Sequence, residues 1–166
     1  RQGDHRAETK RADERKAGLP YVAAMVSNDV ASLSYPLTTN ASIRFLTRAD
    51  AHGWRVYRQS LSFLVAKSLR ELFPAADFTV QHSVGMGLFW SFRANAHDGL
   101  NVAELGRLTA HMRDLVRRNL PIDRRNVAYE DAVRQFEIAG EQDKLKLLQY
   151  RNPPHVVLHV CENFSD

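Results

Sequence analysis

Residues 54–72 carry the clearest periodic pattern in the chain. Apolar positions such as Leu61 and Leu64 follow the three- to four-residue spacing that places side chains on one face of an α-helix. Pro74 comes shortly afterwards and cannot continue a helix. The pattern predicts a long helix that buries one face, preceded by a polar turn over residues 50–53.

Several shorter runs are rich in β-branched and aromatic residues and are bounded by turn residues, which is typical of strands. Gly85 and Gly87 lie between two of these runs and allow the tight backbone of a hairpin. We expect strands over residues 21–26, 30–35, 42–46, 78–82, 88–92 and 155–161.

A second long helix is expected to start at Asn101, because Glu104 stands three residues later, in the spacing of a capping box. This helix should run to about Asn119, and two shorter helices are expected over residues 129–137 and 142–150. Strands, a long helix, a hairpin, further helices and a final strand follow one another along the chain. That order predicts an α+β fold in which the long helix packs on a mainly antiparallel sheet.

The first 18 residues differ from the rest because they are almost entirely polar. A helix over residues 6–17 would have no apolar face to hold it against a core. We therefore expect residues 1–18 to be a polar leader left from an upstream segment. Both ends of the sequence indicate a piece of a longer protein.

Composition narrows the classes of function. The 166 residues are 44% hydrophobic and 25% charged, an ordinary globular balance. No apolar run approaches the roughly 20 residues of a membrane-spanning helix. The single cysteine, Cys161, excludes an internal disulfide framework. We expect a cytoplasmic protein with no membrane partner; the net charge of +4 is too small to establish nucleic-acid binding.

Several motifs of nucleotide and metal chemistry are absent. The sequence contains neither GxxxxGK(S/T) nor HExxH, so it has no P-loop phosphate cradle and no zinc-protease helix. His159 and Cys161 lie two apart on the last expected strand and would share one face, as weak candidates for a metal site. A buried cysteine beside a hydrogen-bonded histidine explains the same pattern, so no metal is expected.

Two other groups are candidates for ligand contact. His82 and Ser83 are neighbours at the end of a strand, but adjacent strand residues point to opposite faces, which argues against a direct relay between them. The densest basic cluster is a candidate for RNA or another anion. It consists of Arg113, Arg117, Arg118, Arg124 and Arg125.

The order of these segments resembles a known family. Residues 54–90, WRVYRQSLSFLVAKSLRELFPAADFTVQHSVGMGLFW, resemble the domain that follows the TGS domain in threonyl-tRNA synthetases and in TGS-containing uridine kinases. Residues 111–151 keep the family's helix, its LPI step and its GE…K…LL helix, and CENFSD at 161–166 resembles a family strand end. Residues 20–50 resemble the C-terminal half of a TGS domain.

The resemblance implies a partial TGS-like segment over 19–50 and an editing-like domain over 51–166. In the synthetases, an HxxxH pair on the long helix helps to hydrolyse mischarged seryl-tRNA. The matching positions here are Gln59 and Phe63, which cannot act as bases near neutral pH. The segment YRQSLSFL in their place is similar to that of the uridine kinases. The resemblance therefore implies that editing is lost.

Three functions follow from the resemblance. The main interpretation is a non-catalytic N-terminal region of a nucleoside kinase, which would bind and regulate its own C-terminal kinase domain. ATP and magnesium are then expected only for that absent domain, and no cofactor is expected in this chain. The alternatives are an aminoacyl-tRNA deacylase domain and an RNA-binding module.

The expected pocket lies between the long helix and the 78–92 hairpin, and it would take a nucleoside, nucleotide or amino acid. Tyr57 and Phe63 would offer stacking surface, and Gln59 would offer both a donor and an acceptor. His82 and Ser83 would line the other side. In the opposite interpretation, Phe63 fills the old cavity.

Overall fold

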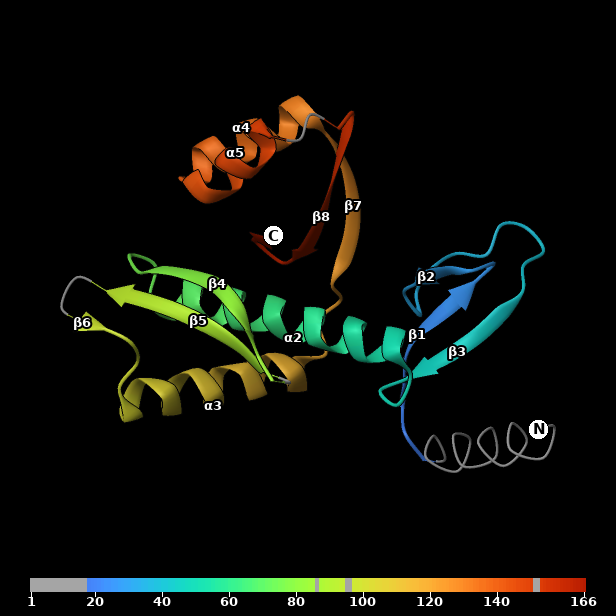
Figure 1. The fold of residues 1–166 in the computed structure, drawn as a ribbon, viewed down its shortest axis with the longest axis horizontal. Coiled ribbons are helices and arrows are strands. Elements are labelled where there is room, and N and C mark those ends of the chain that lie inside the picture. Colours follow the sequence, from blue (N-terminus) through green and yellow to red (C-terminus); the bar gives the residue numbers. More distant parts are fainter. Residues whose placement is uncertain (1–17, 86, 95–96, 151–152) are drawn as a thin grey trace. The chain divides into compact units, whose positions relative to one another are not determined.

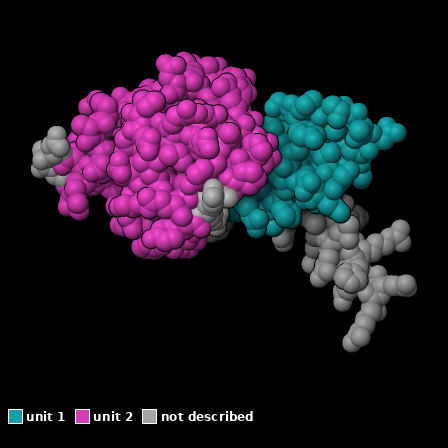
Figure 2. Space-filling model, turned by 90° about the horizontal axis from the view of Figure 1, so that it is seen from above, with its two compact units in different colours: residues 1–66 teal, residues 67–166 magenta. Residues whose placement is uncertain are grey.

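The computed structural model describes residues 18–85, 87–94, 97–150 and 153–166 and divides the chain into two compact units, residues 1–66 and 67–166 (Figures 1 and 2). The described elements are four helices and antiparallel strands, so the predicted α+β class is confirmed. The helix predicted within residues 6–17 lies outside the described residues. The domain boundaries expected after residues 18 and 50 stay predictions.

The first unit contains a three-stranded antiparallel sheet of order β2-β1-β3. Its strands are β1 (Tyr21–Val26), β2 (Asp29–Ala31) and β3 (Ile43–Thr47). Ser27 and Asn28 both have positive φ angles, as in the two-residue turns that match strand twist. The strand expected over 30–35 is therefore wrong in extent, because the chain already turns at Ser32, whose carbonyl accepts from Tyr35 N.

Helix α2 runs over Ala51–Leu72 and starts earlier than predicted. The expected turn at 50–53 is wrong, because the Asp50 carbonyl already accepts from Trp54 N at 2.8 Å. The Asp50 carboxylate accepts from Thr47 N at 2.8 Å and so fixes the chain before the helix. A Cβ at Gly53 would lie 2.0 Å from the Thr47 carbonyl oxygen, so only glycine fits this close approach.

The second unit contains two further three-stranded antiparallel sheets (Figure 1). The hairpin sheet consists of β4 (Asp77–Val84), β5 (Gly87–Ala94) and β6 (His97–Asp98). Helix α3 (Val102–Arg118) follows it. The Asn101 side chain accepts from Glu104 N and Asn101 N donates to Glu104 Oε2, each at 2.9 Å, which confirms the predicted capping box.

The C-terminal sheet, of order β7-β8-β9, packs against two short helices. Strand β8 (His155–Cys161) has the predicted bounds, whereas β7 (Asp123–Ala128) and β9 (Phe164–Ser165) were not predicted. Helices α4 (Tyr129–Ala139) and α5 (Gln142–Gln149) lie over this sheet. Its core contains Ala132, Phe136 and Leu158, with Val127, Leu145, Leu148, Val156 and Val160 packed around them.

Candidate functional site

The helix side of the predicted pocket lies in the first unit. Tyr57 is half-buried on α2, stacks on Trp54 with ring centroids 5.7 Å apart, and has the Arg48 guanidinium 5.4 Å from its ring centre. Gln59 is exposed, whereas Phe63 is only 6% exposed. Neither position carries a group that titrates near neutral pH, and the loss of hydrolysis stays a prediction.

The hairpin side of the predicted pocket lies in the second unit. His82 and Ser83 are exposed residues of β4, opposite Phe89 and Leu88 of β5. The His82 ring stacks on the Phe89 ring, with centroids 5.3 Å apart. Because the helix residues and the hairpin residues belong to different units, the pocket that would join them stays a prediction.

The hairpin sheet has a hollow of its own, with a volume of about 550 Å³. Asp77, Thr79 and Gln81 line it from β4, the consecutive residues 89–93 line it from β5, and Asp98 and Gly99 complete the lining. The Gln81 amide donates to Ser91 Oγ at 2.9 Å within it, and Arg93 Nε lies 3.2 Å from Asp98 Oδ1. The hollow therefore combines amide, hydroxyl and charged groups beside the ring of Phe89.

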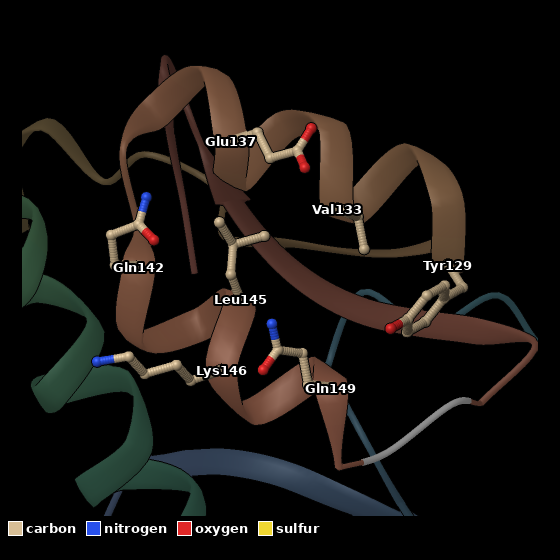
Figure 3. Close-up of a pocket in the computed structure, with 7 residues that line it drawn as sticks. All are labelled: Tyr129, Val133, Glu137, Gln142, Leu145, Lys146 and Gln149. Atoms are coloured by element: carbon tan, nitrogen blue, oxygen red, sulfur yellow. The ribbon is translucent and has the colours of Figure 1, made fainter.

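A second hollow, of about 480 Å³, lies between α4 and α5 (Figure 3). Tyr129, Val133 and Glu137 line it from α4. Four residues of α5 line the other side: Gln142, Leu145, Lys146 and Gln149. The Tyr129 hydroxyl donates to the Leu148 carbonyl at 3.1 Å and so ties the start of α4 to the end of α5.

A charged cluster in the second unit was not predicted. The Lys67 side chain is 1% exposed, and its Nζ lies 2.6 Å from Glu71 Oε1 and 3.0 Å from Glu162 Oε2. His111 Nε2 lies 2.7 Å from the other Glu71 oxygen, and Arg118 forms an ion pair with Glu162. We call these five residues the Lys67 cluster. Its members are up to 95 positions apart in the chain, so no local sequence feature identified the cluster.

The Lys67 cluster fixes its charges through hydrogen bonds. Burial alone lowers the pKa of Lys67, but the hydrogen bonds to Glu71 and Glu162 outweigh it and raise this pKa above its ordinary value. Burial alone raises the pKa of Glu71, but hydrogen bonds with Lys67 and His111 lower it. The hydrogen bond from Lys67 also lowers the pKa of Glu162. These groups are therefore held in their ionised forms.

The five arginines of the basic cluster have different partners. Arg117 pairs with Asp114 at 3.0 Å, and Arg118 is held by Glu162. Arg124 and Arg125 are neighbours on β7 and point to opposite faces of its sheet. All five are exposed, but only some share a surface: Arg113 and Arg117 lie one turn apart on α3.

His159 and Cys161 share one face of β8, as alternation predicted, but Cys161 is 2% exposed and burial raises its pKa. Within the described part of the chain, no three or more His, Cys, Asp or Glu residues are grouped so that they could hold a metal ion. No helix in the same described part is long and apolar enough to cross a membrane.

The chain is similar in sequence to part of several threonine–tRNA ligases. No family model matches the chain. It is 25% identical over 145 residues to a threonine–tRNA ligase from Francisella tularensis subsp. novicida, which covers 87% of this chain and 23% of that protein. Threonine–tRNA ligases from Acidithiobacillus ferrooxidans and Granulibacter bethesdensis are 31% and 29% identical over 128 residues, or 77% of this chain and 20% of each ligase.

The chain thus spans about a fifth of the length of the relatives it matches. These relatives support the resemblance to a region of threonyl-tRNA synthetases. They do not support the link to uridine kinases, and they favour the synthetase-related alternative over the kinase interpretation. The similarity therefore concerns one region of the threonine–tRNA ligases and not the whole enzyme.

Proposed function

We propose that this chain is a tRNA-binding region of the threonyl-tRNA synthetase editing type that does not hydrolyse its ligand. The observation that carries the proposal is the similarity to threonine–tRNA ligases over 77–87% of the chain. It is combined with the expectation from the resemblance that Gln59 and Phe63 stand at the HxxxH positions. The ligases are named for acting on threonine and tRNA. We therefore take tRNA as the macromolecule that this chain would bind.

The loss of hydrolysis rests on the two α2 positions. Hydrolysis of an aminoacyl ester requires a group that accepts a proton from water. The amide of Gln59 does not titrate in the physiological range, and the Phe63 ring has no proton-accepting atom. Phe63 is also 6% exposed, so it occupies space within the folded chain instead of opening onto solvent.

The tRNA contact rests on exposed arginines of the second unit. Arg113 and Arg117 lie one turn apart on α3, and Arg124 lies on β7. Guanidinium groups bind phosphate through paired hydrogen bonds, and each phosphate contact makes binding weaker as salt is added. Arg117, Arg118 and Arg125 contribute less in this proposal than Arg113 and Arg124, because Asp114, Glu162 and Asp123 lie near them.

The test uses the full chain and a labelled tRNA, with binding followed by fluorescence anisotropy across a salt series. Arg113→Glu should weaken binding severalfold and flatten the slope of log affinity against log salt by about 0.7–0.9 per lost contact. Arg134→Glu is the matched control, because Arg134 is an equally exposed arginine on α4. Equal effects of both variants, or no binding by the parent chain, would refute the tRNA proposal.

A deacylation assay tests the second half of the proposal. Seryl-tRNA and threonyl-tRNA incubated with the chain should lose their amino acid at the rate measured without protein. Hydrolysis above that rate would show that catalysis persists without the two histidines. It would overturn the non-hydrolysing assignment without affecting the measured tRNA affinity.

The kinase interpretation remains a second candidate because YRQSLSFL replaces the HxxxH segment. In that case the chain would bind a nucleoside, nucleotide or amino acid and regulate a kinase domain that supplies the ATP and magnesium site. A thermal-shift series with uridine, cytidine, UTP, CTP, ATP, threonine and serine tests it. A ligand at 100 times its dissociation constant adds about 2.7 kcal/mol of stability; no shift with any of them would reject this candidate.

A further inference from the structure

The outer hollow of the hairpin sheet has the parts of a small-molecule site. Its volume of about 550 Å³ lies within the range of ligand pockets. Its lining includes Thr79 and Gln81 of β4 and residues 89–93 of β5. Phe92 also lines the hollow, but it is buried and packs edge-on against Phe73, with centroids 5.3 Å apart. Thr79, Gln81, Phe89 and Arg93 are exposed, so this part of the lining is accessible to a ligand.

An aromatic platform stands at one end of the hollow. Phe89 lines the hollow with 51% of its surface exposed, and the His82 ring stacks on it at a 30° interplanar angle. Since His82 already stacks on one side of the ring, a second ring would stack on the remaining exposed surface of Phe89. Stacking of this kind is the usual way in which proteins hold unpaired bases.

Polar groups lie beside the platform. Gln81 Nε2 donates to Ser91 Oγ at 2.9 Å, and Ser91 Oγ donates to the Thr79 carbonyl at 3.4 Å. These bonds order the Gln81 amide, which still has a second N–H and its carbonyl oxygen to offer. A donor and an acceptor on one planar group match the edge of a nucleobase.

The charges of the hollow select against phosphate. Arg93 stands opposite Asp77 across the two strands, and its Nε lies 3.2 Å from Asp98 Oδ1. The lining of the hollow thus includes two carboxylates and one guanidinium, an excess of one negative charge. Carboxylates repel phosphate but accept hydrogen bonds from sugar hydroxyls.

We propose that this hollow binds a nucleoside without a phosphate group. The base stacks on Phe89, the Gln81 amide contacts the base edge, and the ribose hydroxyls donate to Asp77 and Asp98. This site uses no residue of α2, so it differs from the predicted helix–hairpin pocket. It also uses none of the five arginines, so it does not rest on the tRNA proposal.

Isothermal titration of the full chain with the four ribonucleosides and their 5′-monophosphates tests this proposal. At least one nucleoside should bind, and its monophosphate should bind several-fold more weakly. Phe89→Leu should reduce nucleoside affinity by about fivefold to a hundredfold, because it keeps apolar volume but removes the ring. Asp98→Asn should narrow the gap between nucleoside and monophosphate, because it removes one repelling charge and frees Arg93.

Phe45→Leu provides the matched control, since Phe45 is a 54% exposed strand residue stacked on Tyr21 in the other unit. It should leave nucleoside affinity unchanged. The proposal is overturned if no nucleoside binds, if Phe89→Leu and Phe45→Leu have equal effects, or if monophosphates bind more tightly than nucleosides. Because Phe89 and Asp98 are exposed, these variants should fold, which circular dichroism verifies.

Discussion

The two sheets of the second unit are built from similar parts but are stabilised differently. Both are three-stranded and antiparallel. The C-terminal sheet buries Leu158 against Ala132 and Phe136 of α4, with a shell of aliphatic side chains around them. The hairpin sheet has aromatic and cationic contacts instead: the Arg70 guanidinium lies 5.1 Å from the Phe78 ring centre.

The two sheets differ in how much of their stability comes from buried apolar surface. A sheet covered by a continuous apolar core gains stability from area removed from water, and that gain depends little on salt or pH. The Lys67 cluster links α2 and α3 to Glu162, directly after β8, by charge, whereas the hairpin sheet has aromatic and cation–π contacts. Its outer face is left with polar and aromatic groups, and it is this face that has the proposed ligand site.

The largest effect is expected in the C-terminal sheet. Phe136→Ala should lower the free energy of unfolding by about 3–5 kcal/mol, because it removes a 5% exposed ring from the core. Urea denaturation measures the loss. Ile138→Ala is the control on the same helix, since Ile138 is 89% exposed and its loss should cost less than about 0.5 kcal/mol.

The comparison fails if Phe89→Ala in the hairpin sheet costs as much as Phe136→Ala. Phe89 is half exposed, so its truncation removes far less buried surface. Equal losses would mean that the outer face of the hairpin is part of a core, and the nucleoside proposal would lose its ligand surface.

The next effect concerns the Lys67 cluster. Lys67→Met keeps a long side chain but removes the charge between Glu71 and Glu162, and it should cost about 2–3 kcal/mol. The estimate lies below that of a fully buried pair because both carboxylates remain partly hydrated. Lys146→Met on α5 changes the same charge at an exposed site and should be nearly neutral. A neutral Lys67→Met would show that the cluster does not stabilise the unit.

The Lys67 cluster should also set the response to acid. Glu71 and Glu162 have pKa values below the ordinary 4.5 in the folded chain, so the unfolded chain binds more protons at acidic pH. Their stabilising contribution is present above about pH 4.5 and is lost as the pH falls through the lowered values. Unfolding free energies measured from pH 6 to pH 3 should fall less steeply for Glu71→Gln than for the parent chain. If the unfolding free energies of Glu71→Gln and of the parent chain fell equally with pH, Glu71 would not contribute to the acid response.

Sequence patterns predicted the regular elements better than their contacts. The β8 bounds and the Asn101–Glu104 capping box were found because each depends on neighbours in the chain. Strand β7 was missed, because DRRNVA is polar and becomes a strand only through pairing with β8. The early start of α2 was missed for a similar reason: it depends on the Asp50–Thr47 contact at the end of β3.

The candidate sites show the same limit. The sequence singled out His82, but not Phe89, whose importance depends on the register that places it opposite His82. The Lys67 cluster joins residues that are up to 95 positions apart, and no local pattern links Lys67 to Glu162. Long-range ion pairs of this kind follow from tertiary packing, which periodicity does not encode.

The smallest effect concerns the start of α3, beside the hairpin sheet. Asn101→Ala removes the acceptor for Glu104 N and should cost about 1 kcal/mol. Thr109→Ala in the middle of the same helix is the control: its hydroxyl bonds back to the Leu105 carbonyl, and alanine there should be neutral or slightly stabilising. Because Asn101 and Glu104 cap each other, the double variant Asn101→Ala/Glu104→Ala should cost less than the sum of the two single changes. Urea denaturation of the four variants measures this coupling. Strictly additive losses would mean that the two hydrogen bonds of the capping box act independently.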